Sequence, residues 1–146
     1  TKIKDQFFCP IEKKEEVLKL VDLDISLLNK FPSQLSGGQI QRIVIAIALS
    51  RNIKLLLLDE PTTALDEENK TNIINLINDL KSRLNILILF VTHDIESIKD
   101  ICNEIIILKD GQVIEKGFTI DVLSTPKEDY TKKLINSTFK NKQSRN

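Results

Sequence analysis

The sequence predicts an α/β fold with a mainly parallel sheet and an antiparallel β-hairpin near its C-terminal end. Two short, strongly apolar runs, Leu55–Leu58 and Ile86–Thr92, are separated by a segment with helical periodicity. Continuous apolar runs of this length are typical of strands in parallel sheets. Further along, an Asp-Gly pair stands between two β-prone runs. Such a pair is a strong short-range signal for a hairpin.

The residues before the first strand are predicted to be helical. Glu15–Val21 places apolar residues between charged ones, which indicates a short amphipathic helix. Asp22–Ser33 follows as a loop-rich segment that a proline interrupts. Gly38–Arg51 carries apolar residues at helical spacing over a wide face, so it predicts a longer helix that packs on a core.

The central segment is predicted to alternate between strands and helices. Leu55–Leu58 is expected to form a strand that is covered on both faces. Asp66–Leu84 has acidic residues in its first turn and apolar residues at helical spacing, which predicts a helix with a capped N-terminus. Ile86–Thr92 predicts a second buried strand, and Asp94–Ile101 predicts a helix after it.

The last third of the chain predicts a hairpin followed by helices. Glu104–Leu108 and Gln112–Glu115 are the two strands, joined at the Asp-Gly pair. Thr119–Ser124 and Asp129–Ser137 are expected to form surface helices. Phe139–Asn146 is polar and charged, and it is expected to fray.

Composition narrows the class of protein. The chain has 146 residues, enough for one modest core, and equal numbers of basic and acidic residues, 21 each, so no basic field argues for nucleic acid. Its apolar runs are far shorter than the roughly 20 residues of a membrane-spanning helix, and no secretory leader is visible, so a cytosolic protein is expected. Cys9 and Cys102 lack CxxC or histidine neighbours and are expected to be reduced thiols. The absence of methionine predicts a piece of a longer protein.

Ser36-Gly37-Gly38-Gln39 opens the first long helix. A helix N-terminus leaves amide N–H groups unpaired and carries partial positive charge. Two glycines allow an anion to approach the backbone, and a serine hydroxyl adds a donor, so the string predicts a phosphate site. The alternative is an ordinary helix start capped by serine.

Three polar residues follow the two predicted strands. Asp59 and Glu60 end the first strand, and His93 comes directly after the second. In open α/β sheets, ligands bind at the carboxyl ends of the strands, so these side chains are expected at one edge of the sheet. The alternatives are solvated acids at a strand end and a histidine with a structural role.

Four strings resemble motifs of the ATP-binding cassette (ABC) ATPases. Leu35–Arg42 resembles the signature motif LSGGQxQR, and Leu55–Pro61 resembles the Walker B strand. Thr63–Asp66 resembles the D-loop SALD, with threonine in place of serine. Phe90–Asp94 resembles the switch motif, or H-loop.

The resemblance implies ATP and Mg²⁺ as cofactors and gives each motif a role. Asp59 would hold Mg²⁺, and Glu60 would polarise the hydrolytic water. These separate tasks suit neighbouring carboxylates, because one stays ionised beside the cation while a base must reach the nucleophile. His93 would contact the γ-phosphate. The residues implied to bind ATP are Ser36, Gly37, Gly38, Gln39 and Asp66. Asp66 is also expected to cap the helix that follows it.

The resemblance also implies the carboxyl half of a P-loop NTPase (RecA-like) core. Residues 1–51 would form the ABC helical subdomain with the signature motif, 52–118 the core half, and 119–146 a helical tail, all within one partial ABC ATPase domain. The family's aromatic adenine stack, Walker A loop GxxxxGK(S/T) and Q-loop do not occur in these residues. The 146 residues alone are therefore expected not to bind ATP appreciably, which calorimetric titration would test.

Two segments are similar to the peptide/nickel branch of ABC importers, namely Lys19–Gln34 and Thr125–Leu134. The implied function is ATP hydrolysis coupled to import of peptides or nickel and metal chelates. The implied partners are a second ABC ATPase subunit in a head-to-tail homo- or heterodimer, transmembrane permease subunits and, indirectly, an extracellular substrate-binding protein, with no nucleic acid. The implied location is the cytoplasmic face of the cell membrane.

Two other interpretations of the sequence stay open. One is a soluble ABC ATPase of DNA repair or translation, although such proteins usually carry LSGGE rather than LSGGQ. The other is an inactive, truncated remnant. The DNA upstream of Thr1 would separate a remnant from part of an intact ATPase.

Overall fold

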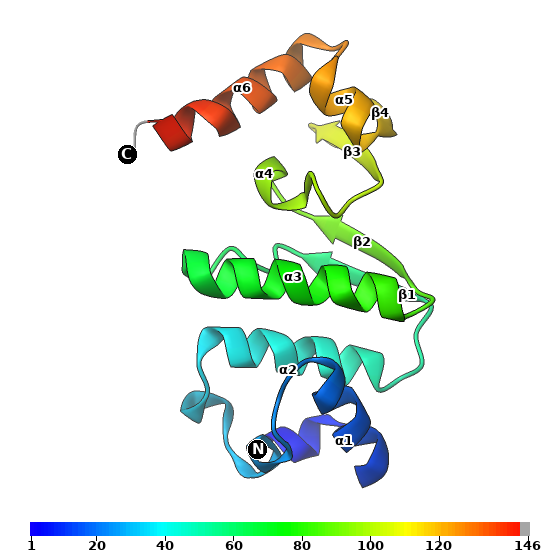
Figure 1. The fold of residues 1–146 in the computed structure, drawn as a ribbon, viewed down its shortest axis with the longest axis vertical. Helices are drawn as coiled ribbons and strands as arrows, with labels where there is room; N and C mark the ends of the chain where they lie inside the picture. Colours follow the sequence, from blue (N-terminus) through cyan, green and yellow to red (C-terminus); the bar gives the residue numbers. More distant parts are fainter. Residues whose placement is uncertain (144–146) are drawn as a thin grey trace. The chain divides into compact units, whose positions relative to one another are not determined.

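The computed structural model describes residues 1–143. They form two compact units (Figure 1). The first unit is Thr1–Thr92, and the second begins at His93. The division into 1–51, 52–118 and 119–146 stays a prediction. None of the helices in the described part of the chain has the length and apolar character needed to cross a membrane.

The first unit contains three α-helices that pack on one another. Helix α2 (Gly37–Leu49) packs against both α1 (Ile11–Leu20) and α3 (Glu67–Arg83) (Figure 1). Helix α1 starts at Ile11 rather than at the predicted Glu15, directly after Pro10 at its N-cap, because a proline φ of −57° suits the entry to a helix. The first unit also contains the 3₁₀ helices η1 (Ile3–Gln6), η2 (Ile25–Asn29) and η3 (Pro32–Gln34). Of these, η2 and the start of η3 lie in the segment predicted as a loop. Fully buried apolar side chains come from α1, α2 and α3: Val17, Leu18, Ile45, Ile73, Ile77 and Leu80.

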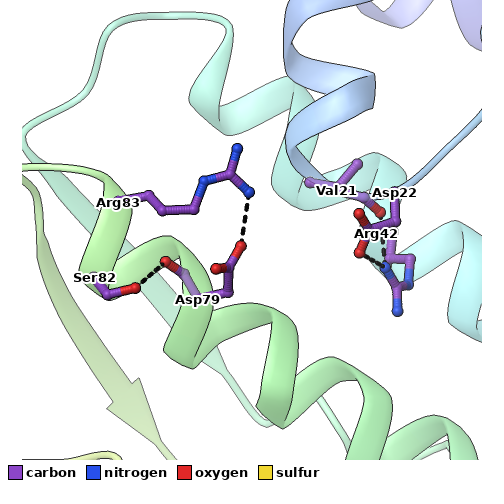
Figure 2. A network of polar contacts seen from close by, with 6 residues as sticks. All are labelled: Val21, Asp22, Arg42, Asp79, Ser82 and Arg83. Atoms are coloured by element: carbon purple, nitrogen blue, oxygen red, sulfur yellow. Dashed lines mark hydrogen bonds and ion pairs between the residues drawn. The ribbon is translucent and has the colours of Figure 1, made fainter.

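Arg42 fastens α2 to the end of α1. Its Nη1 donates to the backbone oxygen of Val21 at 2.8 Å and to Asp22 Oδ2 at 3.2 Å (Figure 2). The Arg42 side chain is 18% exposed, whereas that of Asp22 is 75% exposed. Charge-assisted bonds to a backbone oxygen are stronger when they are shielded from water, so the bond to Val21 is the more stabilising of the two. Figure 2 also shows the exposed Asp79–Arg83 pair on α3, at 2.7 Å.

Strands β1 (Leu55–Asp59) and β2 (Leu87–Val91) form a parallel pair, with α3 as the connection between them. The register runs from Leu55 opposite Leu87 to Asp59 opposite Val91, so both strands end at the same edge. This confirms the predicted α/β order and the parallel sheet. Because Asp59 and Val91 end the two strands side by side, the polar residues that follow them, Glu60 and Thr92, lie at the carboxyl edge of the sheet.

The prediction that the first strand is covered on both faces is wrong for the described residues. Leu56 and Leu58 are buried, but Leu55 and Leu57 are 50% and 58% exposed. Every second residue of strand β2 is likewise exposed: Leu87, Leu89 and Val91. The residues that the structure describes thus cover only one face of this sheet. Apolar composition signals a strand, but which faces are covered depends on layers packed from elsewhere.

The second unit begins with a helix shorter than predicted. Helix α4 spans only Ile95–Ile98. Asp94 caps it, accepting from the Ser97 backbone N at 3.3 Å and from Ser97 Oγ at 2.6 Å. After α4 the chain forms a turn, in which the Cys102 N–H donates to the Ile98 backbone oxygen at 2.9 Å.

The predicted hairpin is present and extends further than expected. Strand β3 (Glu104–Lys109) pairs antiparallel with β4 (Gln112–Phe118). Asp110 and Gly111 have φ values of +51° and +76°, the left-handed geometry of a two-residue hairpin turn. A register shift between Ile107 and Leu108 marks a β-bulge.

Two helices follow the hairpin. Helix α5 (Thr119–Ser124) matches its predicted bounds, and α6 (Asp129–Gln143) is longer than predicted. Helix α6 thus continues into the segment Phe139–Asn146, whose fraying stays a prediction, and residues 144–146 lie outside the described residues. Glu115 on β4 accepts the backbone N–H groups of Lys127 and Glu128 at 2.9 and 3.2 Å. The loop before α6 is thereby attached to the hairpin.

Candidate functional site

The two adjacent carboxylates lie at the carboxyl end of β1. Asp59 is the last residue of the strand and is exposed. Glu60 is half-buried, and its N–H donates to the Val91 oxygen at 2.9 Å. Glu60 has a φ of +45°, in the left-handed region that a glutamate rarely adopts. Such a conformation persists only where surrounding contacts hold it, and it is common at functional sites.

Hydroxyl groups hold the Glu60 carboxylate. Thr63 Oγ1 donates to Glu60 Oε2 at 2.5 Å, and Thr92 Oγ1 approaches the same oxygen at 3.4 Å. Thr63 comes from the turn after β1, and Thr92 follows β2, so residues from both strand ends converge on one carboxylate. Sequence motifs alone assigned a role to neither threonine.

His93 directly follows Thr92 and is exposed. It is the first residue of the second unit. Its predicted contact with the γ-phosphate stays a prediction.

The signature string forms a capping box. Ser36 Oγ accepts from the Gln39 backbone N at 3.2 Å, and Gln39 Oε1 accepts from the Ser36 backbone N at 3.1 Å. The serine-capped helix start, given above as the alternative to a phosphate site, is therefore present. A capping serine keeps its hydroxyl proton, so the two roles are compatible.

The two glycines at the start of α2 differ in how closely other side chains approach them. A Cβ placed on Gly38 would lie 2.5 Å from Asn69 Oδ1, a distance at which one of the two groups must shift. A Cβ on Gly37 would lie 3.2 Å from Leu65 Cδ2. The first turn of α2 therefore lies directly against the D-loop-like segment and the start of α3. This packing links the strings that resemble the signature motif and the D-loop.

Asp66 caps α3, as the sequence predicts. Its Oδ1 accepts from the Asn69 backbone N at 2.8 Å, and the Asn69 side chain donates to both carboxylate oxygens at 3.1 and 2.9 Å. The backbone N–H of Asn69, followed by its side-chain amide, holds the pKa of the Asp66 carboxyl below its ordinary value. The capping role is thus confirmed, while the ATP-related role of Asp66 stays a prediction.

The chemistry of the exposed Asp59 fits one magnesium ligand. No group of three or more His, Cys, Asp or Glu residues within the described range could hold a metal ion. Mg²⁺ in nucleotide sites, however, is usually bound through one or two carboxylates, with phosphate oxygens and waters filling the other positions. A single carboxylate at the ligand-binding edge of a parallel sheet is sufficient for that arrangement.

Three residues without an assigned role in the sequence prediction emerge at the site: Thr63, Thr92 and Asn69. Asn69 stands three residues after Asp66, the spacing at which a helix cap meets its partner N–H, so a local signal for it existed. Thr63 also stands three residues from its partner Glu60. No local signal pairs Thr92 with Glu60, because they are 32 residues apart.

Comparison with known proteins gives consistent matches. Residues 4–63 match the family model described as ABC transporter. The methionine import ATP-binding protein MetN of Bacillus subtilis (strain 168) is 42% identical over 125 residues, which cover 86% of this chain and 36% of that protein. The chain thus spans about a third of the length of this relative.

Two solved structures have similar folds. One, an inward-facing putative metal-chelate type ABC transporter, has a TM-score of 0.71 at 33% identity, over 76% of this chain and 44% of the other. The other, cbiO1 from Clostridium perfringens, part of the ABC transporter complex cbiONQ, has a TM-score of 0.71 at 32% identity, over 78% and 45%. The described chain therefore has the α/β fold of the ATP-binding domains in these ABC transporter structures, and residues 4–63 are similar to the ABC transporter family.

Proposed function

We propose that these residues belong to the ATP-binding subunit of an ABC import system and couple ATP hydrolysis to transport. The observation that carries the proposal is the carboxylate pair at the end of β1, with Glu60 held in a left-handed conformation beside the exposed Asp59. A base fixed in position beside a metal-binding carboxylate is an arrangement suited to hydrolysis of a nucleoside triphosphate. The match of residues 4–63 to the ABC transporter model supports the same assignment.

Each residue of the site has one task in this proposal. Asp59 holds Mg²⁺, which when bound neutralises charge on the phosphate oxygens. Glu60 accepts the proton of the attacking water, and His93 contacts the γ-phosphate. Ser36 and the first amides of α2 bind the phosphates of ATP held by a second ATP-binding subunit, because a helix N-terminus presents donors to an anion.

The proposed partners follow from that division of tasks. A second ABC ATPase subunit, identical or different, completes each ATP site. Transmembrane permease subunits receive the motion, and an extracellular binding protein delivers the substrate to them. The proposed location is the cytoplasmic face of the membrane. The similarity to cbiO1, which is itself part of the transporter complex cbiONQ, supports a multi-subunit assembly.

For the substrate, we propose methionine before peptides or nickel. The relative from Bacillus subtilis is named as a methionine import ATP-binding protein, and so are similar proteins from Lactococcus lactis and Streptococcus mutans. The peptide/nickel branch rests on the similarity of Lys19–Gln34 and Thr125–Leu134 to its members. Methionine is therefore the first ligand to test.

Glu60→Gln tests the enzymatic part of the proposal. In the full-length subunit assembled with its partners, this variant should lose ATP hydrolysis by about 10²-fold or more, since a general base contributes about 10²–10⁴-fold. The matched control is Glu104→Gln, which changes an exposed glutamate on β3 and should keep normal turnover. Normal turnover of Glu60→Gln would refute the proposed function.

A reconstituted transporter tests the substrate. ATP hydrolysis should rise when binding protein loaded with methionine is added outside the vesicles, and the Glu60→Gln assembly should show no rise. Stimulation by a peptide or a nickel chelate, but not by methionine, would overturn the methionine proposal. ATP hydrolysis by the purified subunit without any permease would instead favour a soluble ABC ATPase.

A further inference from the structure

Glu60 has an unfavourable, left-handed backbone conformation and a long, flexible side chain. With its φ of +45°, the backbone enters a tight turn, in which the backbone N of Thr63 lies 3.4 Å from the backbone oxygen of Glu60. A glutamate side chain has several rotatable bonds, and without anchoring contacts it samples many positions. A general base must nevertheless reach its proton within hydrogen-bond distance.

Two hydroxyl groups supply the anchoring contacts. Thr63 Oγ1 donates to Glu60 Oε2 at 2.5 Å, a short bond of the kind formed by hydroxyl and carboxylate. Thr92 Oγ1 lies 3.4 Å from the same oxygen, at the outer limit of a hydrogen bond. Because both hydroxyls meet one oxygen, they fix the direction in which the carboxylate presents its other oxygen.

We propose that Thr63 is a positioning residue that orients the Glu60 carboxylate for ATP hydrolysis. Thr92 acts as a weaker second donor to the same carboxylate. This inference rests on the proposed function. It gives a role to the threonine that replaces serine in the D-loop-like string. A serine at this position keeps the hydroxyl, whereas valine keeps the β-branched shape and loses the donor.

The test compares Thr63→Val, Thr63→Ser and Thr63→Ala in the full-length subunit assembled with its partners. Thr63→Val should lower kcat for ATP hydrolysis about tenfold with KM for ATP unchanged, because misplacing a base affects the chemical step. Thr63→Ser should restore kcat to within about twofold of wild type. The matched control is Thr71→Val, since Thr71 Oγ1 donates to the Glu67 backbone oxygen on its own helix.

Each outcome has a defined meaning. Normal kcat in Thr63→Val would overturn the inference, and so would a raised KM with unchanged kcat, because that pattern indicates weaker ATP binding. Equal loss in Thr63→Ser and Thr63→Val would also overturn it, since the hydroxyl would then be irrelevant. If Thr63→Val unfolds, Thr63→Ala is measured against the same criteria.

Glu60→Gln separates this inference from the proposed function. If Glu60→Gln hydrolyses ATP normally, the proposed function fails. If Glu60→Gln is inactive but Thr63→Val is normal, only the positioning role fails. ATP-dependent dimerisation, followed by light scattering, provides a second readout, and Thr63→Val should leave it unchanged if the threonine acts on the chemical step alone.

Discussion

Replacing Gly38 with alanine is expected to destabilise the protein, because the site has no room for a Cβ. The added carbon would lie 2.5 Å from Asn69 Oδ1 and 3.2 Å from Asn69 Cγ. The Asn69 side chain cannot move away freely, since its amide donates to both oxygens of Asp66 at 3.1 and 2.9 Å. Relief of the clash therefore disrupts the cap of α3.

The magnitude follows from opposing terms. Overpacking costs about 1–3 kcal/mol, and each hydrogen bond lost costs about 0.5–1.5 kcal/mol, with the lower end applying at this exposed cap. Alanine gains up to about 1 kcal/mol over glycine within a helix. The net loss for Gly38→Ala should be about 1 kcal/mol, or roughly 2–4 °C in Tm for a domain of about 150–250 residues.

Thermal and urea unfolding of the full-length protein, followed by circular dichroism, would measure this loss. In an Asn69→Ala background the clash is absent, so Gly38→Ala should become stabilising by about 0.5–1 kcal/mol. Gly37→Ala is the matched control. Its nearest neighbour is the flexible end of Leu65 at 3.2 Å, so it should be close to neutral. An equal loss from Gly38→Ala in both backgrounds would refute the reasoning.

Further predictions concern the turn, the α1–α2 contact and acid stability. Gly111→Ala should destabilise the hairpin by about 1–2 kcal/mol through its φ of +76° alone, because nothing lies within 4 Å of the new Cβ; unchanged hydrogen exchange in β3 and β4 would contradict this. In urea unfolding, Arg42→Ala should cost about 1.5–3 kcal/mol by leaving the Val21 oxygen unpaired, whereas Asp22→Asn should cost less than about 1 kcal/mol; equal losses would be evidence against the bond to Val21. The pKa of Glu115 is held below its ordinary 4.5 by backbone N–H groups of the following loop, so its stabilising effect is present above that pH and is lost as the pH falls through the lower, folded-state pKa. The stability gap between wild type and Glu115→Gln should therefore close in acid, and a gap that is constant with pH would argue against this account.

Local signals predicted most of the secondary structure. The Asp-Gly turn of the hairpin, the Asp66 cap of α3 and the Ser36 start of α2 depend on contacts within a few residues, so the sequence contains all the information about them. The apolar runs predicted both strands of the parallel pair for the same reason. The candidate residues of the site could likewise be named from their motifs, and their placement after strands predicted the edge on which Asp59 and Glu60 lie.

Only the tertiary structure decided what surrounds those residues. Contacts between segments that lie far apart in the chain decide three features of the structure. These are which face of β1 is covered, the close approach of Gly38 to Asn69, and the approach of Thr92 to Glu60. Periodicity states which side of an element is apolar, but it does not state which side chains from other elements reach it. The roles of Gly38 as a close-packed residue and of Thr92 as a second donor to Glu60 therefore become visible only once the chain is folded.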